Sequence, residues 1–306
     1  MKMARRKFLT STLAGAGGMI LGCSGAGAKR AADGPPPGPF EIVPLGKTGL
    51  KVSRVGLGTG MHGGNRQSDH TRLGRERLEG LVRAAYDRGI RLFDMADLYG
   101  THPYVGRALK PMPRDQYVLV SKIWVRRGGI PERERPGANI LLDRFRKELA
   151  TDYVDIVQLH CMTSKTWTDE QKKQMDLLEN LKAKGIIRAH GISCHSVEAM
   201  SAAAASPWVD VVHARVNAFG AAMDAPPEKV APVLKQLCAA GKGVIGMKLV
   251  GEGRFRDDDH KKDESIRWAL RPDRVDTMVV GCLSEAEIDD FCGRVARIVK
   301  AAGSRA

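Results

Sequence analysis

The sequence predicts an α/β fold, a single-domain (β/α)8 TIM barrel with an N-terminal hairpin. Three observations support this prediction. Short apolar segments alternate with segments of helical periodicity, the connections between them are short, and the 306 residues suit a barrel of roughly 250 residues plus extensions. Such alternation with short connections makes the strands parallel, and eight parallel strands close into a barrel.

Eight apolar segments are expected to form the barrel strands: residues 52–58, 90–94, 118–122, 154–160, 189–193, 209–216, 243–247 and 276–280. Between them, apolar residues recur with the period of a helix, as Leu141, Leu142 and Phe145 do. Glycine follows several expected helices, as at Gly89, because it accommodates the left-handed conformation at a helix end. Residues 42–52 are expected to form a hairpin that covers the barrel floor.

An open, doubly wound sheet is the alternative architecture. It would place the phosphate-binding pattern G-x-G-x-x-G after its first strand. Gly56-Leu57-Gly58-Thr59-Gly60 supplies glycines at that place but lacks the spacing. The sequence therefore favours the closed barrel.

The first 28 residues are expected to be an export signal. Arg5 and Arg6 precede an apolar run over residues 9–21, which resembles a twin-arginine signal and is too short to span a bilayer as a helix. The sequence thus predicts recognition by the twin-arginine export machinery and an exported protein, periplasmic or membrane-anchored. A cytoplasmic protein that begins with a basic patch is the alternative.

Two maturation sites compete in this segment. Residues 20–23 resemble a lipobox, which would lipidate Cys23 and anchor the protein in the membrane, whereas residues 26–28 resemble a cleavage site between small residues. Residues 29–39 are rich in proline and glycine and are expected to form a stiff spacer. The predicted organisation is a signal at 1–28, a spacer at 29–39 and the barrel at 40–306.

The composition is that of a soluble globular protein, with 43% hydrophobic and 27% charged residues. The net charge of +14 favours anionic ligands or a membrane surface. Nucleic-acid binding is not expected because the Lys and Arg residues are dispersed. No metal site is expected, since the cysteines lack C-x-x-C pairs and the histidines lack H-x-H or H-E-x-x-H spacing. Cys161, Cys238 and Cys292 are expected to be buried.

Four polar residues come in order at or just after the carboxyl ends of expected strands: Asp94, Tyr99, Lys122 and His160. In a parallel barrel these ends lie on one face, where barrel enzymes carry their catalytic residues. Each residue alone has a structural explanation, as an ion pair, a packed ring or a satisfied histidine. Together they predict an active site that transfers protons.

The same residues lie in motifs that resemble the aldo/keto reductase family, over about residues 42–298. The motifs are Gly56-Leu57-Gly58-Thr59, Phe93-Asp94-x-Ala96-x-x-Tyr99-Gly100, Val120-Ser121-Lys122, Asp152-Tyr153-Val154-Asp155-x-x-x-x-His160, Gly191-Ile192-Ser193 and Arg267-Trp268-Ala269-Leu270. The resemblance implies hydride transfer between a nicotinamide cofactor, NAD(P)(H), and a small carbonyl or alcohol substrate.

The resemblance also implies a role for each of the four residues, and the chemistry is consistent with it. Tyr99 is the expected proton donor to the carbonyl oxygen. Lys122 is expected to lower the pKa of Tyr99, and Asp94 to keep Lys122 charged. His160 is expected to hydrogen-bond the carbonyl oxygen. Asp97, in the same loop as Tyr99, is expected to be a solvated acid.

The resemblance places the cofactor-binding residues too, with several departures from the family. They are Thr59, Ser193, Cys194, His213, Met247, Lys248, Gly281, Cys282 and Ser284. Cys194 stands where most members have Asn, His213 where Gln is usual, and Met247 where Tyr is usual. Glu287 stands near the family's basic position for the 2′-phosphate of NADP, with Glu285 beside it. NAD versus NADP therefore stays open, and NAD(H) is expected to bind at least as well.

The substrate pocket has no readable code. Its candidate lining residues are Met61, His62, Trp124, Trp167 and Phe219. An alternative function is an exported barrel that acts as a binding or regulatory subunit with slight or no turnover. The departures at the cofactor site and the scarcity of nicotinamide cofactors outside the cytoplasm favour it.

Overall fold

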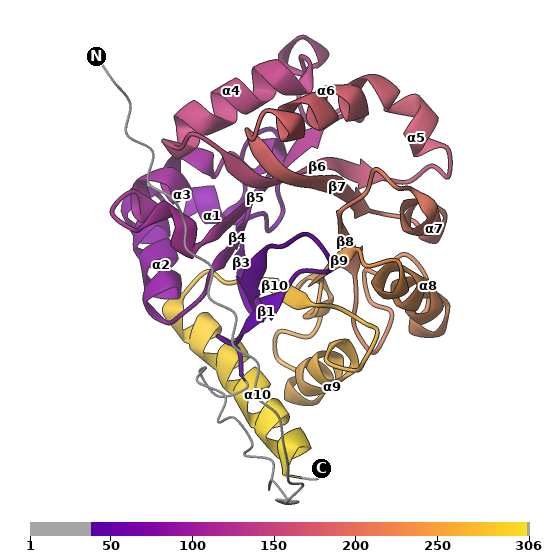
Figure 1. Cartoon of the computed structure of the whole chain (residues 1–306). Coiled ribbons are helices and arrows are strands. Elements are labelled where there is room, and N and C mark those ends of the chain that lie inside the picture. Colours follow the sequence, from indigo (N-terminus) through magenta and orange to yellow (C-terminus); the bar gives the residue numbers. More distant parts are fainter. Residues whose placement is uncertain (1–37, 305–306) are drawn as a thin grey trace, which may run out of the picture. The chain divides into compact units, whose positions relative to one another are not determined.

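A computed structural model describes residues 38–304. Its centre is a closed barrel of eight parallel strands in the order β10-β3-β4-β5-β6-β7-β8-β9 (Figure 1). The barrel strands are β3 (Val55–Gly58), β4 (Leu92–Asp94), β5 (Val118–Trp124), β6 (Val154–Met162), β7 (Ile187–Cys194), β8 (Val211–Arg215), β9 (Gly243–Met247) and β10 (Thr277–Gly281). The predicted (β/α)8 barrel is confirmed.

Helices connect the strands and cover the outside of the barrel (Figure 1). The α-helices are α1 (Asp69–Arg72), α2 (Arg75–Asp87), α3 (His102–Leu109), α4 (Ala138–Leu149), α5 (Trp167–Glu170), α6 (Lys172–Ala183), α7 (Val197–Ala205), α8 (Pro227–Ala239), α9 (Asp259–Ala269) and α10 (Glu285–Gly303). Short 3-10 helices are η1 (Asp97–Tyr99), η2 (Arg114–Gln116), η3 (Glu132–Glu134) and η4 (Gly251–Gly253). The apolar residues of α4 that repeat with helical period, Leu141, Leu142 and Phe145, are buried, as predicted.

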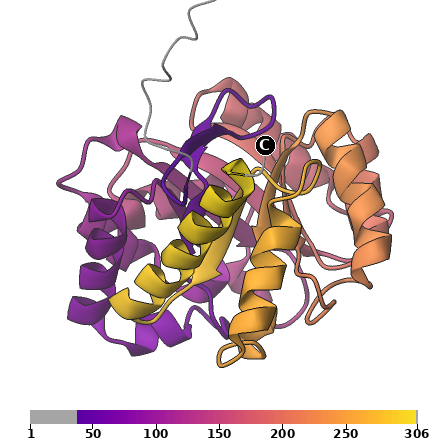
Figure 2. The ribbon, with the colours of Figure 1, turned by 90° about the horizontal axis from the view of Figure 1, so that it is seen from below.

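Helices α9 and α10 lie side by side on the outside of the barrel (Figure 2). Arg294 of α10 joins them, because its guanidinium reaches Asp259 at 2.6 Å and Asp263 at 2.9 Å on α9. These ion pairs hold the last helix against its neighbour after the chain has left β10.

The N-terminal hairpin covers one end of the barrel. Strands β1 (Ile42–Pro44) and β2 (Lys51–Ser53) pair antiparallel, with Val43 opposite Val52. Leu45 and Leu50, between them in the chain, are buried in one cluster with inward residues of the barrel strands, such as Leu92. The predicted hairpin is confirmed. It covers the end of the barrel opposite to the carboxyl ends of the strands.

The boundaries of some strands differ from the prediction. The first barrel strand begins at Val55 rather than at residue 52, because residues 51–53 pair with β1 instead. Strand β6 continues past His160 to Met162, with a register shift after Leu159, and Cys161 has a positive φ of 64°. This irregularity turns the end of β6 just where a predicted catalytic residue lies.

The signal at 1–28, Cys23 and most of the 29–39 spacer lie outside the described residues. Among residues 38–304, no helix combines the length and the apolar composition needed to cross a membrane.

Candidate active site

The fold brings the four predicted catalytic residues together. Asp94 is the last residue of β4, Tyr99 the last of η1, Lys122 lies in β5 and His160 in β6. These strands are neighbours and parallel, so their carboxyl ends meet at one face of the barrel.

A buried ion pair forms the base of this site. Lys122 is 1% exposed, and its Nζ donates to Oδ1 of Asp94 and, at 3.0 Å, to the carbonyl oxygen of Met95. Burial alone would raise the pKa of Asp94, but Lys122 and His213 outweigh it and lower this pKa to about 2. Asp94 is therefore ionised at neutral pH, as the predicted pairing with Lys122 requires.

Tyr99 and His160 are in direct contact. The Tyr99 hydroxyl lies 3.2 Å from Nε2 of His160, within hydrogen-bond distance. Trp124 packs edge-on against His160, with ring centroids 5.2 Å apart. Burial, together with the charge of Lys122, holds the pKa of His160 well below its usual value, so the imidazole is neutral.

The pKa of Tyr99 is not lowered overall in this structure, as the expected effect of Lys122 alone would have it. Burial is the largest effect, and it raises the pKa of Tyr99 well above its usual value. The nearby charge of Asp94 raises it further, while the Lys122 ammonium, 5.4 Å from the ring centroid, donates to Asp94. Tyr99 is therefore protonated, which is the form that a proton donor needs.

Two glycines that the sequence interpretation did not single out hold the Tyr99 ring. A Cβ added to Gly60 would lie 2.5 Å from Cδ2 of the ring and closer still to Cε2 and Cζ. A Cβ on Gly63 would lie 2.9 Å from Cε1 and closer to Cδ1. The ring thus packs on bare backbone of the loop after β3. The signal in the sequence for this packing is the glycine-rich run after the first barrel strand.

The expectation that Asp97 is a solvated loop acid is also wrong. The Asp97 side chain is 2% exposed, and its Oδ1 lies 2.9 Å from Nε of Arg66 and 2.6 Å from Nη2 of Arg144. Arg66 comes from the loop after β3 and Arg144 from α4, so the two charges meet Asp97 only in the folded chain. They offset the cost of burying this carboxylate beside Tyr99.

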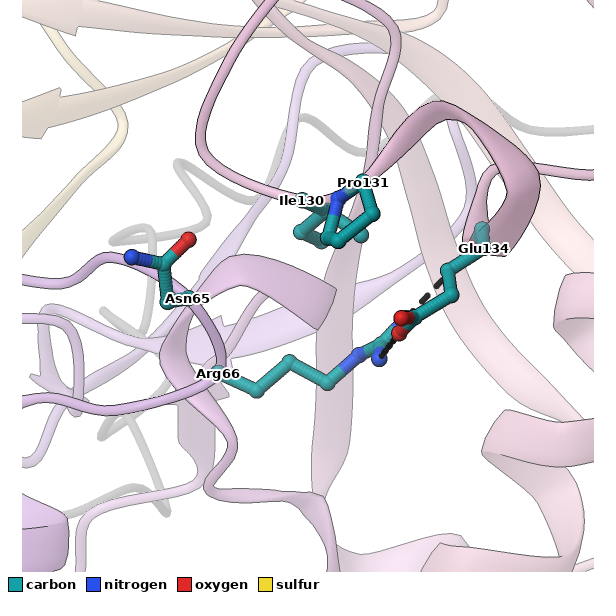
Figure 3. A pocket seen from close by; sticks show the side chains of 5 residues that line it. All are labelled: Asn65, Arg66, Ile130, Pro131 and Glu134. Atoms are coloured by element: carbon teal, nitrogen blue, oxygen red, sulfur yellow. Dashed lines mark hydrogen bonds and ion pairs between the residues drawn. The ribbon is translucent and has the colours of Figure 1, made fainter.

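Figure 3 shows where the loop after β3 meets the loop that contains η3. Arg66 reaches across to Glu134 of η3, and a cavity of about 280 Å³ lies there, lined by Asn65, Ile130 and Pro131 in addition to this pair. None of its lining residues belongs to the catalytic set. The cavity is beside the site, since Arg66 is bound to Asp97.

The expected nicotinamide-binding residues lie at the ends of β7 to β9. The Ser193 hydroxyl accepts from the backbone N–H of Cys161 at 2.8 Å. Cys194 is fully buried, and burial raises the pKa of its thiol well above the usual value. His213 is also fully buried, with Nε2 3.1 Å from Oδ1 of Asp94. Met247 ends β9 and is partly exposed.

Other expected cofactor residues are engaged by the protein itself. Thr59 is buried, and its hydroxyl donates to the carbonyl oxygen of Asp94 at 2.8 Å. Lys248 pairs with Glu252 through an Nζ to Oε1 distance of 2.5 Å. The carbonyl oxygen of Cys282 lies 3.0 Å from Nε2 of the buried His70.

The expected phosphate end lies after β10. Gly281 ends this strand, and Ser284 caps α10 by accepting from the backbone N–H of Glu287 at 3.2 Å. The Glu287 carboxylate accepts from the N–H of Leu283, one residue before the cap, at 2.7 Å. Glu285 pairs with Arg88 at 2.9 Å.

The five expected pocket residues divide into different environments. Trp124 contacts His160, and Met61 packs against the Cα of Gly281. His62 faces solvent beside Asp69, at 2.6 Å, and Phe219 packs on Phe255 in the loop after β9. Trp167 is fully buried and donates to the carbonyl oxygen of Ala199, so its expected place in the pocket is wrong. Its neighbours belong to the core between helices.

Two features of the structure fit a nicotinamide dinucleotide. Nδ1 of His213 is buried without a hydrogen-bond partner among the described residues, and it lies on the strand next to Ser193. The N-terminus of the long helix α10, which attracts phosphate, follows directly on the last barrel strand. No cluster of three or more metal-ligating side chains occurs between residues 38 and 304.

The chain is thus a (β/α)8 barrel whose carboxyl face brings together the four residues predicted to be catalytic. The model of the aldo/keto reductase family matches residues 54–265, and the chain belongs to that family. It is accordingly an NAD(P)-dependent oxidoreductase of the class that interconverts carbonyls and alcohols.

Relatives and solved structures agree with this assignment. The chain is 29% identical over 240 residues to the aldo-keto reductase YhdN of Bacillus subtilis, covering 72% of this chain and 68% of that protein. It is 28% identical over 201 residues to the NADH-specific methylglyoxal reductase of Escherichia coli, covering 60% and 61%.

Among structures, the holo form of aldo-keto reductase AKR11C1 from Bacillus halodurans is similar with a TM-score of 0.65 at 21% identity, covering 83% of this chain and 90% of that one. An aldo/keto reductase of Klebsiella pneumoniae in complex with NADP and acetate has a TM-score of 0.63 at 20% identity, covering 83% and 89%. These structures support the fold.

Proposed function

We propose that this protein reduces a small carbonyl compound, or oxidises the corresponding alcohol, with Tyr99 as the proton donor. The contact between the Tyr99 hydroxyl and Nε2 of His160 carries the proposal. The support is that a protonated hydroxyl and a neutral imidazole are adjacent at the carboxyl face, so that a carbonyl oxygen bound there would accept hydrogen bonds from both. Bound NAD(P)H supplies the hydride.

The other two residues act through Tyr99. Lys122, charged and buried beside the ring, stabilises the phenolate that remains after Tyr99 gives up its proton. Asp94 keeps Lys122 charged and fixes the position of its ammonium group. Asp94 is therefore a positioning residue. His213 contacts it from β8, on the opposite side of the barrel from β4.

The substitution Tyr99→Phe tests this proposal. We expect it to lower kcat for aldehyde reduction by about 10²- to 10⁴-fold, because it removes the proton donor and leaves the ring. The dissociation constant of the nicotinamide cofactor, measured by fluorescence titration, should change little. The matched control is Tyr104→Phe on α3, where the ring packs against Arg107 outside the site.

Equal turnover by Tyr99→Phe and the parent would contradict the assignment. An aldehyde panel that includes methylglyoxal and 4-formylbenzoate separates the two candidate functions. Cofactor binding by the parent without turnover of any compound would favour the binding or regulatory subunit.

For the cofactor, we propose that Ser193 and His213 bind the nicotinamide carboxamide and that the α10 N-terminus binds phosphate. We further propose that NAD(H) binds at least as well as NADP(H). The support is the acidic first turn of α10. Glu285 in this turn pairs with Arg88, whereas Glu287 has no cationic partner among the described residues.

We also propose export through the twin-arginine route, on the basis of Arg5 and Arg6 before a weak apolar run. Replacing both with Lys should retain the protein in the cytoplasm, as cell fractionation would measure. Export of the double-Lys variant would contradict this route. Mass spectrometry of the exported protein would distinguish lipidation at Cys23 from cleavage after Ala28.

A further inference from the structure

Four nitrogen-bearing side chains lie at or just after the carboxyl ends of neighbouring barrel strands. Arg126 follows β5 by two residues, His195 comes directly after β7, Arg215 ends β8 and Lys248 comes directly after β9. Strands β5 to β9 are consecutive in the barrel. These four residues, called here the basic rim, therefore lie along one arc of the face that carries the catalytic residues.

Most charges of the basic rim have an acidic partner. Nε of Arg215 lies 2.7 Å from Oδ1 of the buried Asp224, and Lys248 pairs with Glu252. Arg126 is different: it is exposed, and the part of the chain that the structure describes gives it no ion-pair partner. One positive charge of the rim is therefore uncompensated.

The charges of the basic rim affect His195 and Cys161. Sγ of Cys161, next to His160 in the chain, lies 3.2 Å from Nε2 of His195. Burial and then the charges of Arg215, Lys248 and Arg126 lower the pKa of His195 to about 3, so its imidazole is neutral. Burial raises the pKa of the Cys161 thiol to about 11, although the same cations oppose it.

The loop that carries Arg126 is tied to the site. Trp124 packs on His160, and its indole N–H donates to the carbonyl oxygen of Gly128 at 2.6 Å. A Cβ added to Gly129 would lie 2.9 Å from the same indole nitrogen, so the loop folds closely over Trp124. Arg126 lies between these contacts in the sequence.

We propose that the carbonyl substrate of this enzyme carries a carboxylate, and that Arg126 binds it at the basic rim with His195 as a second hydrogen-bonding group. This inference rests on the proposed function and names its substrate class. A guanidinium offers a planar fork that matches a carboxylate, and a single uncompensated cation suits a singly charged group. Oxo acids are thus preferred over neutral aldehydes of the same size.

The test compares 4-formylbenzoate with its methyl ester, which share the aldehyde and differ in charge. We expect kcat/KM of the parent to be about tenfold or more higher for the acid, the range of a charge-assisted hydrogen bond. Arg126→Met should remove most of this preference, and its kcat/KM for the ester should stay within about twofold of the parent value. Arg127→Met, the neighbouring exposed arginine, is the control and should behave as the parent.

Calorimetric titration with benzoate and benzamide adds a readout that does not depend on turnover. Equal kcat/KM for acid and ester in the parent, or equal losses in the two arginine variants, would overturn the assignment of Arg126. Absence of turnover together with benzoate binding that requires Arg126 would support the carboxylate site and overturn the reductase function. Neither turnover nor benzoate binding would overturn both.

Discussion

Replacing Gly60 with alanine should displace the Tyr99 ring and lower turnover without touching any polar group of the site. The added Cβ would lie 2.5 Å from Cδ2 of the ring and closer to two further ring carbons. Carbon atoms in contact normally stay about 3.5–4.0 Å apart, so the ring or the loop must move by about 1 Å. Such overpacking typically costs about 1–3 kcal/mol of stability.

A displacement of this size matters because the Tyr99 hydroxyl is only 3.2 Å from Nε2 of His160. Misplacing a reacting group by about 1 Å can cost on the order of 10²-fold in rate. We therefore expect Gly60→Ala to lower kcat for aldehyde reduction by about 10²-fold, with a smaller change in cofactor affinity. Gly63→Ala, whose Cβ meets the other edge of the ring, should act in the same direction.

The matched control is Gly64→Ala in the same loop, because no atom lies within 4 Å of its added Cβ. Steady-state kinetics with NADH or NADPH gives kcat, and thermal unfolding by circular dichroism reports whether each variant is folded. A folded Gly60→Ala enzyme with the kcat of the parent would refute the reasoning, since the contact with Tyr99 would then not fix the catalytic hydroxyl. A loss of the same size in Gly64→Ala would refute it as well.

Three further predictions concern stability and cofactor choice. Burial lowers the pKa of His70 to about 4, so the neutral imidazole contributes its full stability above pH about 6.5, and this stability is lost as the pH falls toward 4. Urea unfolding should show that the parent loses about 3 kcal/mol more stability over this pH range than His70→Gln does. Asp97→Asn should lower the free energy of unfolding by about 2 kcal/mol, since it removes the buried carboxylate that Arg66 and Arg144 share, while exposed Asp152→Asn should not. Glu287→Arg should shift the ratio of dissociation constants toward NADP(H) by several-fold in calorimetry, and Glu287→Gln, which can still accept from the Leu283 N–H, should shift it less; strong preference of the parent for NADP(H) would contradict this reasoning.

The sequence by itself was sufficient for the barrel, the hairpin and the order of the four candidate residues. These features depend on local patterns: apolar period, glycine at helix ends, and polar residues where strands end. The same locality explains the error at β3, because the local sequence of residues 52–58 does not reveal that residues 51–53 pair with β1.

The tertiary structure alone decided the electrostatic and packing environment of the site. Asp97 is buried because Arg66 and Arg144, distant from it in sequence, meet at its carboxylate. The pKa of Tyr99 rises because the folded chain buries its hydroxyl and brings the charge of Asp94 close to it. Charges and contacts of this kind depend on distances between segments far apart in the chain, and a one-dimensional pattern does not encode those distances.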